Sequence, residues 1–252
     1  MQFRLRTLLI AVTLVTLPLG YVAWERQQCR RGQQAMEMLN QKSEYLPAVT
    51  RFGTSAYNRP KWLKSILGDD EFRRVNNAVL GGNSFSDSDV RALALLPNLD
   101  YVVIESPNVT DEGVTHLRGL KKVERFHVIG NRSLSGKSWA VLGEWQHLHV
   151  LWLDGSHFGG DGILQLPALA NLKELSVNNT NLTDAGLERI SWLPNLESLD
   201  LSHTQVSDAG LVHLKRLANL KDLTLENTKI TNAGVKELRK ALPNAVISHW
   251  KS

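Results

Sequence analysis

Apolar residues recur along this chain in a pattern that repeats every 24 or 25 residues. The pattern has the form L-x-x-L-x-L. Its seven copies begin at Val75, Leu99, Val123, Leu148, Leu172, Leu196 and Leu220. A fixed period of this length is the sequence signature of a repeat architecture, in which each unit packs mainly against its two neighbours.

Each unit has two halves with different apolar periods. In the first half, Leu199 and Leu201 are two residues apart, which is the period of a strand with one buried face. In the second half, Leu211, Leu214 and Leu217 recur every three residues and form one stripe along a helix or a tight helical turn. Each unit therefore predicts a strand followed by a helical segment.

The bend between the two halves carries polar residues and glycine. Thr183-Asp184 and Ser207-Asp208 stand just before the helical stripes, where the first N–H groups of a helix need side-chain oxygens as acceptors. Gly186, Gly210 and Gly234 follow, where a larger side chain would crowd the bend. These residues predict where each helical segment begins.

Stacking is what makes such units stable, because one strand–helix unit cannot bury both of its apolar stripes alone. The bulkier helices spread on the outside of the stack while the strands lie about 4.7–4.9 Å apart, so the stack curves. The pattern thus predicts an α/β solenoid with a parallel sheet on the concave face and helices on the convex face.

Three units depart from the regular pattern. The unit from Val123 keeps its helical stripe, Trp139, Leu142 and Trp145, only if one residue is inserted. The next unit has glycines at 159, 160 and 162 in place of the usual bend residues. Residues 245–250 lie where an eighth strand is expected, one residue late, and we interpret them as a degenerate C-terminal cap.

The N-terminus carries an apolar segment without charges, residues 7–24. A helix of this length spans roughly 27 Å, close to the thickness of the hydrocarbon core of a bilayer. Arg4 and Arg6 precede the segment, and Tyr21 and Trp24 mark its far end as interfacial aromatic residues do. We expect an uncleaved signal anchor over residues 1–24. The alternative, a cleaved signal peptide, usually has a shorter apolar core and small residues at its end.

The region between this anchor and the repeats divides into two predicted parts. Residues 25–57 are expected to form a juxtamembrane stalk, of which the part around Ala35, Met38 and Leu39 has helical spacing. Residues 58–74 contain Pro60 near a helix start, and we expect an N-terminal capping helix. The repeat domain then covers residues 75–252.

The net positive charge of the chain lies in its N-terminal part, where the membrane anchor is expected. The whole chain carries 29 Lys and Arg against 25 Asp and Glu. Residues 1–89 hold twelve basic and eight acidic residues, which leaves seventeen of each for residues 90–252. A neutral repeat domain argues against a nucleic-acid partner, because phosphate binding needs a basic face. The one cysteine, Cys29, has no partner in the chain for a disulfide.

The segments NLTDAGLERISWLPNLESLDLSHTQVSDAGL and ITNAGVKEL resemble the leucine-rich-repeat family, most closely its T-D-A-G-L subtype. The resemblance covers about residues 72–250. These repeats are also similar to those of F-box-type ubiquitin-ligase receptors, and the apolar leader looks like that of membrane-anchored planctomycete proteins of this class. The chain has Thr180, Thr204 and Thr228 where many such repeats have an asparagine. The resemblance implies protein recognition without implying a particular partner.

Function is expected on the concave sheet, where side chains between the buried leucines point to solvent. The third, fifth and seventh positions of the units form three columns, with an aromatic and aliphatic patch in the middle units and an acidic stretch toward the C-terminus. The predicted partner-binding residues are Tyr101, Val103, Glu105, Arg125, His127, Trp152, Asp154, Glu174, Asn178, Asp200, Asp222 and Glu226. An exposed tryptophan among apolar neighbours is the kind of residue that dominates interface energies.

No enzyme motif was found in the sequence: it has no H-E-x-x-H, paired-cysteine, G-x-S-x-G or P-loop pattern. A weak metal site at Asp154, Asp200 and His203 is an alternative reading of the acidic stretch. We expect no catalytic residues and no cofactor. The leading hypothesis is a single-pass protein of a bacterial cytoplasmic membrane whose repeats bind a protein or peptide on the outer side. The alternatives are a structural envelope protein that packs laterally and a ubiquitin-ligase-type substrate receptor.

Overall fold

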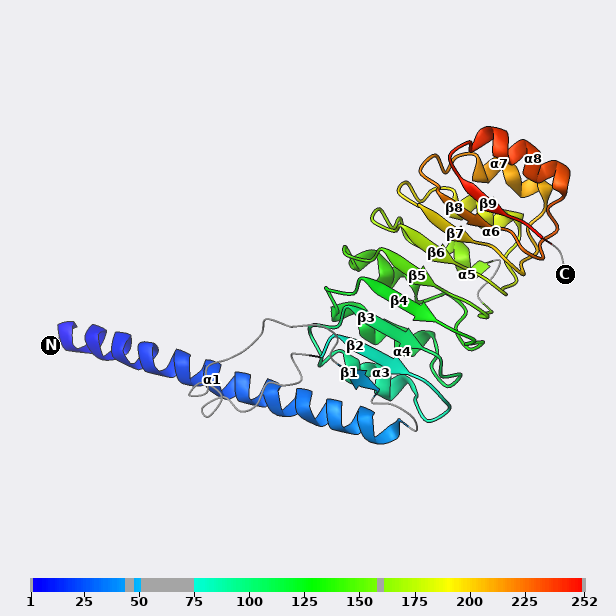
Figure 1. The fold of residues 1–252 in the computed structure, drawn as a ribbon. Helices are drawn as coiled ribbons and strands as arrows, with labels where there is room; N and C mark the ends of the chain where they lie inside the picture. Colours follow the sequence, from blue (N-terminus) through cyan, green and yellow to red (C-terminus); the bar gives the residue numbers. More distant parts are fainter. Residues whose placement is uncertain (1, 44–47, 51–74, 158–160, 251–252) are drawn as a thin grey trace.

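The computed structural model describes residues 2–43, 48–50, 75–157 and 161–250, with the backbone alone for residues 2–18, 49, 50 and 161. Within these ranges nine strands form one sheet, in sequence order from β1 to β9 (Figure 1). The strands are β1 Val49–Thr50, β2 Asn77–Leu80, β3 Tyr101–Ile104, β4 Arg125–Val128, β5 Val150–Trp152, β6 Glu174–Ser176, β7 Ser198–Asp200, β8 Asp222–Thr224 and β9 Val246–Ser248. β1 is antiparallel to β2, and β2 to β9 are parallel.

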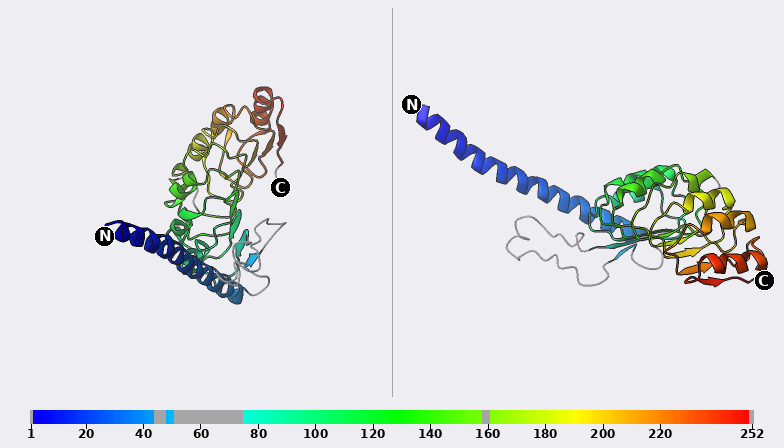
Figure 2. Two further views of the ribbon diagram at one scale, coloured as in Figure 1. Left: turned by 90° about the vertical axis from the view of Figure 1, so that its left-hand side faces the viewer. Right: turned by 90° about the horizontal axis from the view of Figure 1, so that it is seen from above.

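The helical segments that follow the strands cover one face of the sheet. Figure 2 shows them on the outer side of a curved stack, with the sheet lining the inner side. They are α3 Asp87–Leu93, α4 Asp111–Thr115 with the 3₁₀ turn η2 His116–Gly119, η3 Trp139–Glu144, α5 Asp161–Leu164, α6 Asp184–Ile190, η4 Asp208–Gly210 with α7 Leu211–Leu214, and α8 Asn232–Ala241. The prediction of a curved α/β solenoid is confirmed.

Strand register follows the sequence period. Tyr101 pairs with Arg125, 24 residues on, whereas Arg125 pairs with Val150, 25 residues on. The residue inserted in the unit from Val123 is therefore accommodated outside the strands, as predicted. At the C-terminal end Asp222 pairs with Val246, again at 24 residues. The expectation that the last strand begins one residue late is wrong.

The core is one continuous layer between sheet and helices. The strand leucines Leu199 and Leu201 and the helical stripe Leu211, Leu214 and Leu217 are all buried. Burying a leucine side chain contributes about 1.5–3 kcal/mol, so each unit adds several such increments to its neighbours.

Aromatic residues occupy the core of the irregular unit from Val123. Phe126 makes edge-to-face contacts with Trp139 and Trp145, at ring-centroid distances of 6.5 and 5.2 Å. These large side chains take the place that leucines hold in regular units, and the helical stripe predicted after the insertion is buried.

The bends between strands and helices are tied together by aspartate. Asp184 accepts hydrogen bonds from the Ser207 N–H, at 2.8 Å, and the Ser207 hydroxyl, at 2.7 Å. Asp208 accepts the equivalent bonds from Thr231, at 2.8 and 2.7 Å. A Cβ atom at Gly210 would overlap Asp184 Oδ1. The Thr/Ser-Asp-x-Gly sequence therefore joins consecutive units: the glycine makes room for the carboxylate that the preceding unit supplies.

The threonines that replace asparagine after the strands act within their own unit. The hydroxyls of Thr204 and Thr228 donate to the carbonyls of Leu201 and Leu225, at 2.6 and 3.0 Å. Asn131 instead reaches the preceding unit, since its amide donates to the Ser106 carbonyl at 2.6 Å. Threonine closes the turn locally and asparagine adds a bond between units.

α1, Gln2–Lys42, runs from the predicted anchor into the repeat core. Its N-terminal half extends away from the stack, and its C-terminal half lies against the end at β1 and α3 (Figures 1 and 2). Cys29, Ala35 and Leu39 belong to the hydrophobic core. Lys42 Nζ lies 2.7 Å from the buried Asp89 carboxylate. The segment expected to be a stalk is thus helical as far as Lys42 and covers the first repeat, because its few apolar residues share one helical face.

Residues 58–74, the predicted capping helix, lie outside the described residues. Residues 7–24, the predicted anchor, lie in α1 with side chains described from residue 19 onward. Among the described residues, no helix has a stretch both long and apolar enough to cross a membrane.

Candidate partner-binding surface on the concave sheet

The strand register aligns the predicted site residues in columns on the concave sheet. Tyr101, Arg125, Val150 and Glu174 follow one another in the first column. The second column contains Val103, His127, Trp152, Ser176 and Asp200. The third column contains Asp154, Asn178 and Ser202. The residue that follows each of them donates its backbone N–H group to the next unit.

The third column continues past the strand ends because the residues that follow it adopt a left-handed backbone conformation. Gly155, Asn179 and His203 have φ values of 66°, 54° and 56°. Each turns its N–H toward the carbonyl of the neighbouring third-column residue, at 2.7–2.9 Å. Glycine and asparagine tolerate this conformation best, and His203 adopts it with its ring exposed.

Three aromatic rings pack together in the middle units. We call Tyr101, His127 and Trp152 the aromatic cluster. The His127 ring stacks on Trp152, with centroids 4.1 Å apart and planes 11° apart, and meets Tyr101 edge-on at 4.9 Å. His127 Nδ1 lies 3.1 Å from the Tyr101 hydroxyl.

Charged side chains fix the outer members of the cluster. The Arg125 guanidinium lies 4.5 Å from the centroid of the Tyr101 ring. The Trp152 indole N–H donates to Glu174 at 2.7 Å. The cluster is therefore an ordered platform, in which Tyr101 and Trp152 are partly exposed and held in place by their neighbours.

Two residues predicted to contact a partner are in fact buried. His127 is 6% exposed and Val103 is 3% exposed. His127 lies between the rings of Tyr101 and Trp152, in contact with both, and Val103 lies between Val79 and His127 in the sheet register. Burial, and then the nearby positive charge of Arg125, lowers the pKa of His127 from 6.5 to about 4. The ring is thus neutral at physiological pH and links the other two rings of the cluster.

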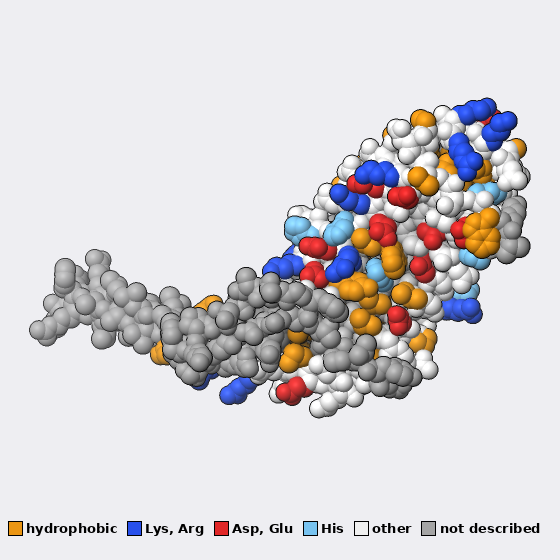
Figure 3. All heavy atoms as spheres, viewed as in Figure 1, with side chains coloured by type: hydrophobic (Ala, Val, Ile, Leu, Met, Phe, Trp, Pro, Cys, Tyr) orange, Lys and Arg blue, Asp and Glu red, His pale blue; other side chains and the backbone are white. Residues whose placement is uncertain are grey.

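Apolar area on this face comes instead from aliphatic residues beside the cluster. Val79 is 38% exposed and Ile129 is 36% exposed. Figure 3 shows hydrophobic side chains gathered over β3 to β5, with acidic side chains beside them toward the C-terminal end. Val79 belonged to a predicted column but gave no signal of its own, because alternation does not reveal how much of a side chain its neighbours cover.

The acidic stretch has two parts. Asp154 and Asp200 lie close enough that the charge of one affects the other, and both bond to backbone N–H groups. Asp222 and Glu226 share the face, but no hydrogen bond or ion pair joins their side chains to the other site residues among those described. Glu105 is exposed at the N-terminal side of the aromatic cluster.

Within the described residues, no three His, Cys, Asp or Glu side chains are grouped to hold a metal ion.

Comparisons with known proteins agree with this architecture. A family model described as leucine-rich repeats in two copies matches residues 170–213. The fold is similar to that of internalin C2 from Listeria monocytogenes, at 16% identity and a TM-score of 0.51, over 86% of this chain and 91% of that chain. No curated protein matches the chain.

Two further solved structures have lower TM-scores. A second internalin from Listeria monocytogenes aligns at 18% identity and a TM-score of 0.45, over 73% of this chain and 64% of that chain. A leucine-rich-repeat protein of Leptospira interrogans aligns at 25% identity and a TM-score of 0.49, over 70% of this chain and 43% of that chain.

The chain is thus a curved α/β solenoid similar in fold to internalin C2, with leucine-rich repeats matched over residues 170–213. Proteins built on this scaffold generally act in protein–protein recognition rather than catalysis, and their specificity resides in the side chains that each chain displays.

Proposed function

We propose that this chain is a membrane-anchored recognition scaffold that binds a protein or peptide on its concave face. The observation that carries the proposal is the aromatic cluster, whose partly exposed Trp152 is held rigidly by His127 and Glu174. A rigid, partly buried aromatic ring flanked by apolar area is typical of residues that dominate interface energies. The acidic side chains next to it favour a partner with a hydrophobic anchor and a basic flank.

The anchor is proposed to be residues 7–24, in a bacterial cytoplasmic membrane with the repeats on the outer side. The far end of this segment exposes Leu19, Tyr21 and Trp24 at 61%, 59% and 53%. Aromatic residues at this position favour the membrane–water interface, and Arg4 and Arg6 favour a cytoplasmic N-terminus.

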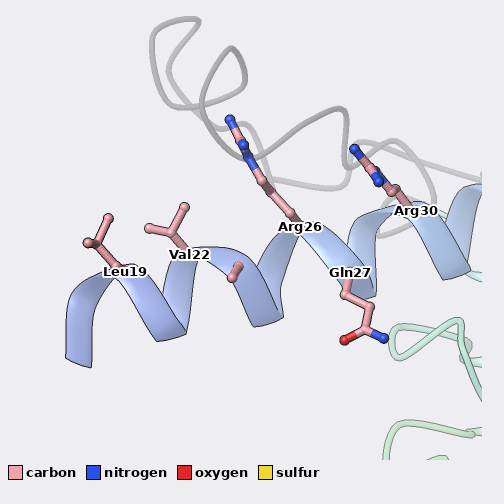
Figure 4. Close-up of a pocket in the computed structure, with 6 residues that line it drawn as sticks. Leu19, Val22, Arg26, Gln27 and Arg30 are labelled. Carbon is pink, nitrogen blue, oxygen red and sulfur yellow. The ribbon is translucent and has the colours of Figure 1, made fainter. Parts of the chain in front are cut away.

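A groove of about 410 Å³ runs along the same part of α1. Its lining passes from Leu19, Val22 and Ala23 to Arg26, Gln27 and Arg30. Figure 4 shows Leu19, Val22, Arg26 and Arg30 pointing to one side of the helix. This change from apolar to basic residues within three turns fits a helix that leaves a bilayer through its headgroup layer.

Cross-linking from native membranes tests the recognition function. The full chain is compared with a Trp152→Ala, Asp200→Ala variant and with a Trp192→Ala, Glu188→Ala control, which changes the same kinds of residue on the helical side. Trp192 is more exposed than Trp152 and contacts Arg216, so its loss matches the loss of aromatic area. We expect the partner to bind the first variant about 30-fold more weakly and the control unchanged.

Equal capture by all three chains would contradict recognition on the concave face and favour lateral packing in an envelope assembly. Orientation is checked separately by a cysteine on the repeats, since Cys29 is 1% exposed and resists labelling. A Lys236→Cys variant should react with an impermeant maleimide in cells whose outer layers are permeabilised. Labelling only after lysis would place the repeats in the cytoplasm.

A further inference from the structure

Four polar residues lie near the C-terminal ends of β5 to β7, beside the aromatic cluster. We call Asp154, Asn178, Asp200 and Ser202 the acceptor cluster. Asp154 Oδ1 accepts from the Ser176 hydroxyl at 2.5 Å and from the Asn178 N–H at 3.1 Å. Asp200 Oδ1 accepts from the Ser202 N–H at 2.8 Å. The second oxygen of each carboxylate receives no hydrogen bond from the described residues.

Two further oxygens in the acceptor cluster are buried without partners. Ser202 is 4% exposed, and within the described part of the chain neither its hydroxyl nor the Asn178 side-chain oxygen forms a hydrogen bond. A buried polar atom that has lost water without gaining a partner is costly, and native structures contain few of them. A ligand that donates hydrogen bonds to these two oxygens removes that cost, once the neighbouring side chains shift to admit it.

The charge of the acceptor cluster is also uncompensated. Burial, opposed by hydrogen bonds from Ser176 and Asn178 and reinforced by the charge of Asp200, raises the pKa of Asp154. Among the described residues, no Lys or Arg forms an ion pair with either carboxylate. Two partly buried carboxylates on either side of β6 thus favour a positive charge between them.

The chemistry of the oxygens narrows the kind of cation. A calcium ion takes six to eight oxygen ligands and is usually held by several carboxylates, whereas the acceptor cluster has two, and no three His, Cys, Asp or Glu of the described residues are grouped to hold a metal ion. A lysine ammonium needs acceptors for three donors, and an arginine guanidinium has five donors. Each carboxylate has an oxygen that receives no hydrogen bond from the described residues, so the acceptor cluster matches a cation that brings its own N–H groups.

We propose that the acceptor cluster binds a lysine or arginine side chain of the partner, next to a hydrophobic side chain seated on the aromatic cluster. This inference rests on the proposed recognition function. Trp152 and Asp154 are two residues apart near the end of β5, about 7 Å along the strand. The basic residue of the partner therefore lies within two or three positions of its hydrophobic anchor.

Selection from a random peptide library displayed on phage tests this proposal, with the full chain held in lipid nanodiscs as bait. The test variant is Asp154→Asn, Asp200→Asn, which keeps Oδ1 as an acceptor at both positions and so preserves the bonds to Asn178 and Ser202. The control, Glu112→Gln, Glu188→Gln, removes the same charge from exposed helical positions. Trp152→Ala is selected in parallel.

We expect the full chain and the control to enrich peptides with an aromatic or aliphatic residue within three positions of Lys or Arg. The Asp154→Asn, Asp200→Asn variant should lose the preference for the basic residue while keeping the hydrophobic one. For one enriched synthetic peptide, replacing Lys by acetyl-lysine should weaken binding to the full chain about 10- to 100-fold. The same replacement should have little effect with the variant.

Hydrophobic enrichment without a basic residue would overturn the acceptor-cluster proposal and leave the recognition function standing. Enrichment that Trp152→Ala does not change, or no enrichment at all, would overturn both. Selection is repeated in EDTA and in calcium chloride, and a preference for acidic instead of basic peptides that appears only with calcium would replace the ammonium site by a metal site.

Discussion

At the scale of single residues, a glycine and an aspartate from neighbouring units depend on each other. Gly210 leaves space for the Asp184 carboxylate, which in turn holds the N–H and hydroxyl of Ser207. We expect Gly210→Ala to destabilise the repeats by about 1–3 kcal/mol, because the added methyl group displaces that carboxylate. The measurement is the denaturation midpoint in urea.

Gly119→Ala is the matched control for this change, because nothing lies within 4 Å of the added Cβ atom. Its effect should be neutral or slightly stabilising, since alanine restricts the unfolded chain. Equal midpoints for the two variants would contradict the role given to Asp184.

The neutral state of His127 gives a second prediction at this scale. Its pKa is lowered to about 4 in the folded chain, against an ordinary value of 6.5. Between these values the unfolded chain binds a proton that the folded chain does not, so stability is lost as the pH falls from 6.5 toward 4. Trp152→Ala uncovers the ring and should move its pKa back toward 6.5.

NMR titration of the histidine ring Cε1–H signals measures this pKa, with His127→Asn identifying the signal. Trp192→Ala should leave the titration of His127 unchanged. A wild-type His127 that titrates near pH 6.5 would show that the stacked arrangement does not persist in solution.

At the scale of elements, α1 is part of the repeat core at its C-terminal end, whatever its N-terminal half contacts. Leu39 is fully buried in the core, and its neighbour Met38 is 38% exposed. We expect Leu39→Ala to cost about 2–5 kcal/mol of repeat stability and Met38→Ala to cost much less. Thermal unfolding followed by circular dichroism compares the two variants. A flexible stalk would give equal melting temperatures for both.

The elements that follow the repeat period were predictable from sequence, and those that do not were less so. Pairing of Tyr101 with Arg125 and of Arg125 with Val150 follows from the leucine pattern and its single insertion. The docking of α1 on the first repeat could not be predicted in this way, because its sparse apolar residues among glutamines and arginines carry only a weak periodic signal. A reader of the sequence sees where Leu39 falls on a helix, not what it packs against.

The candidate site divides in the same way. Alternation along a strand assigns His127 and Trp152 to the concave face, and they lie there. Alternation does not tell that one ring covers the other, because that depends on rotamers and on side chains from adjacent units. The acceptor cluster was visible only in part, since its unpaired oxygens are defined by hydrogen bonds that the neighbouring residues do not make.

At the scale of the whole molecule, a continuous helix joins the proposed anchor to the first repeat. From Trp24 to Lys42 the helix spans roughly 27 Å, and its last turns are fixed to the first repeat by Lys42 and Asp89. In the proposed arrangement, α1 therefore sets the direction of the concave face relative to the membrane. A long flexible linker would instead let the face sample many directions.

This arrangement predicts that the anchor and the cap are separable parts of one helix. A chain that begins at Glu25 keeps Cys29, Ala35 and Leu39 and should fold with the stability of the full repeats, yet remain in solution when mixed with lipid vesicles. The full chain should float with the vesicles in a density gradient. A chain that begins at Ser43 should be less stable, because it lacks the residues that cover the first repeat.

If the chain from Glu25 floats as well as the full chain, the membrane contact does not reside in residues 7–24. If the full chain stays at the bottom of the gradient, the membrane anchor itself is wrong, whereas the concave surface and its partner remain to be tested on their own evidence.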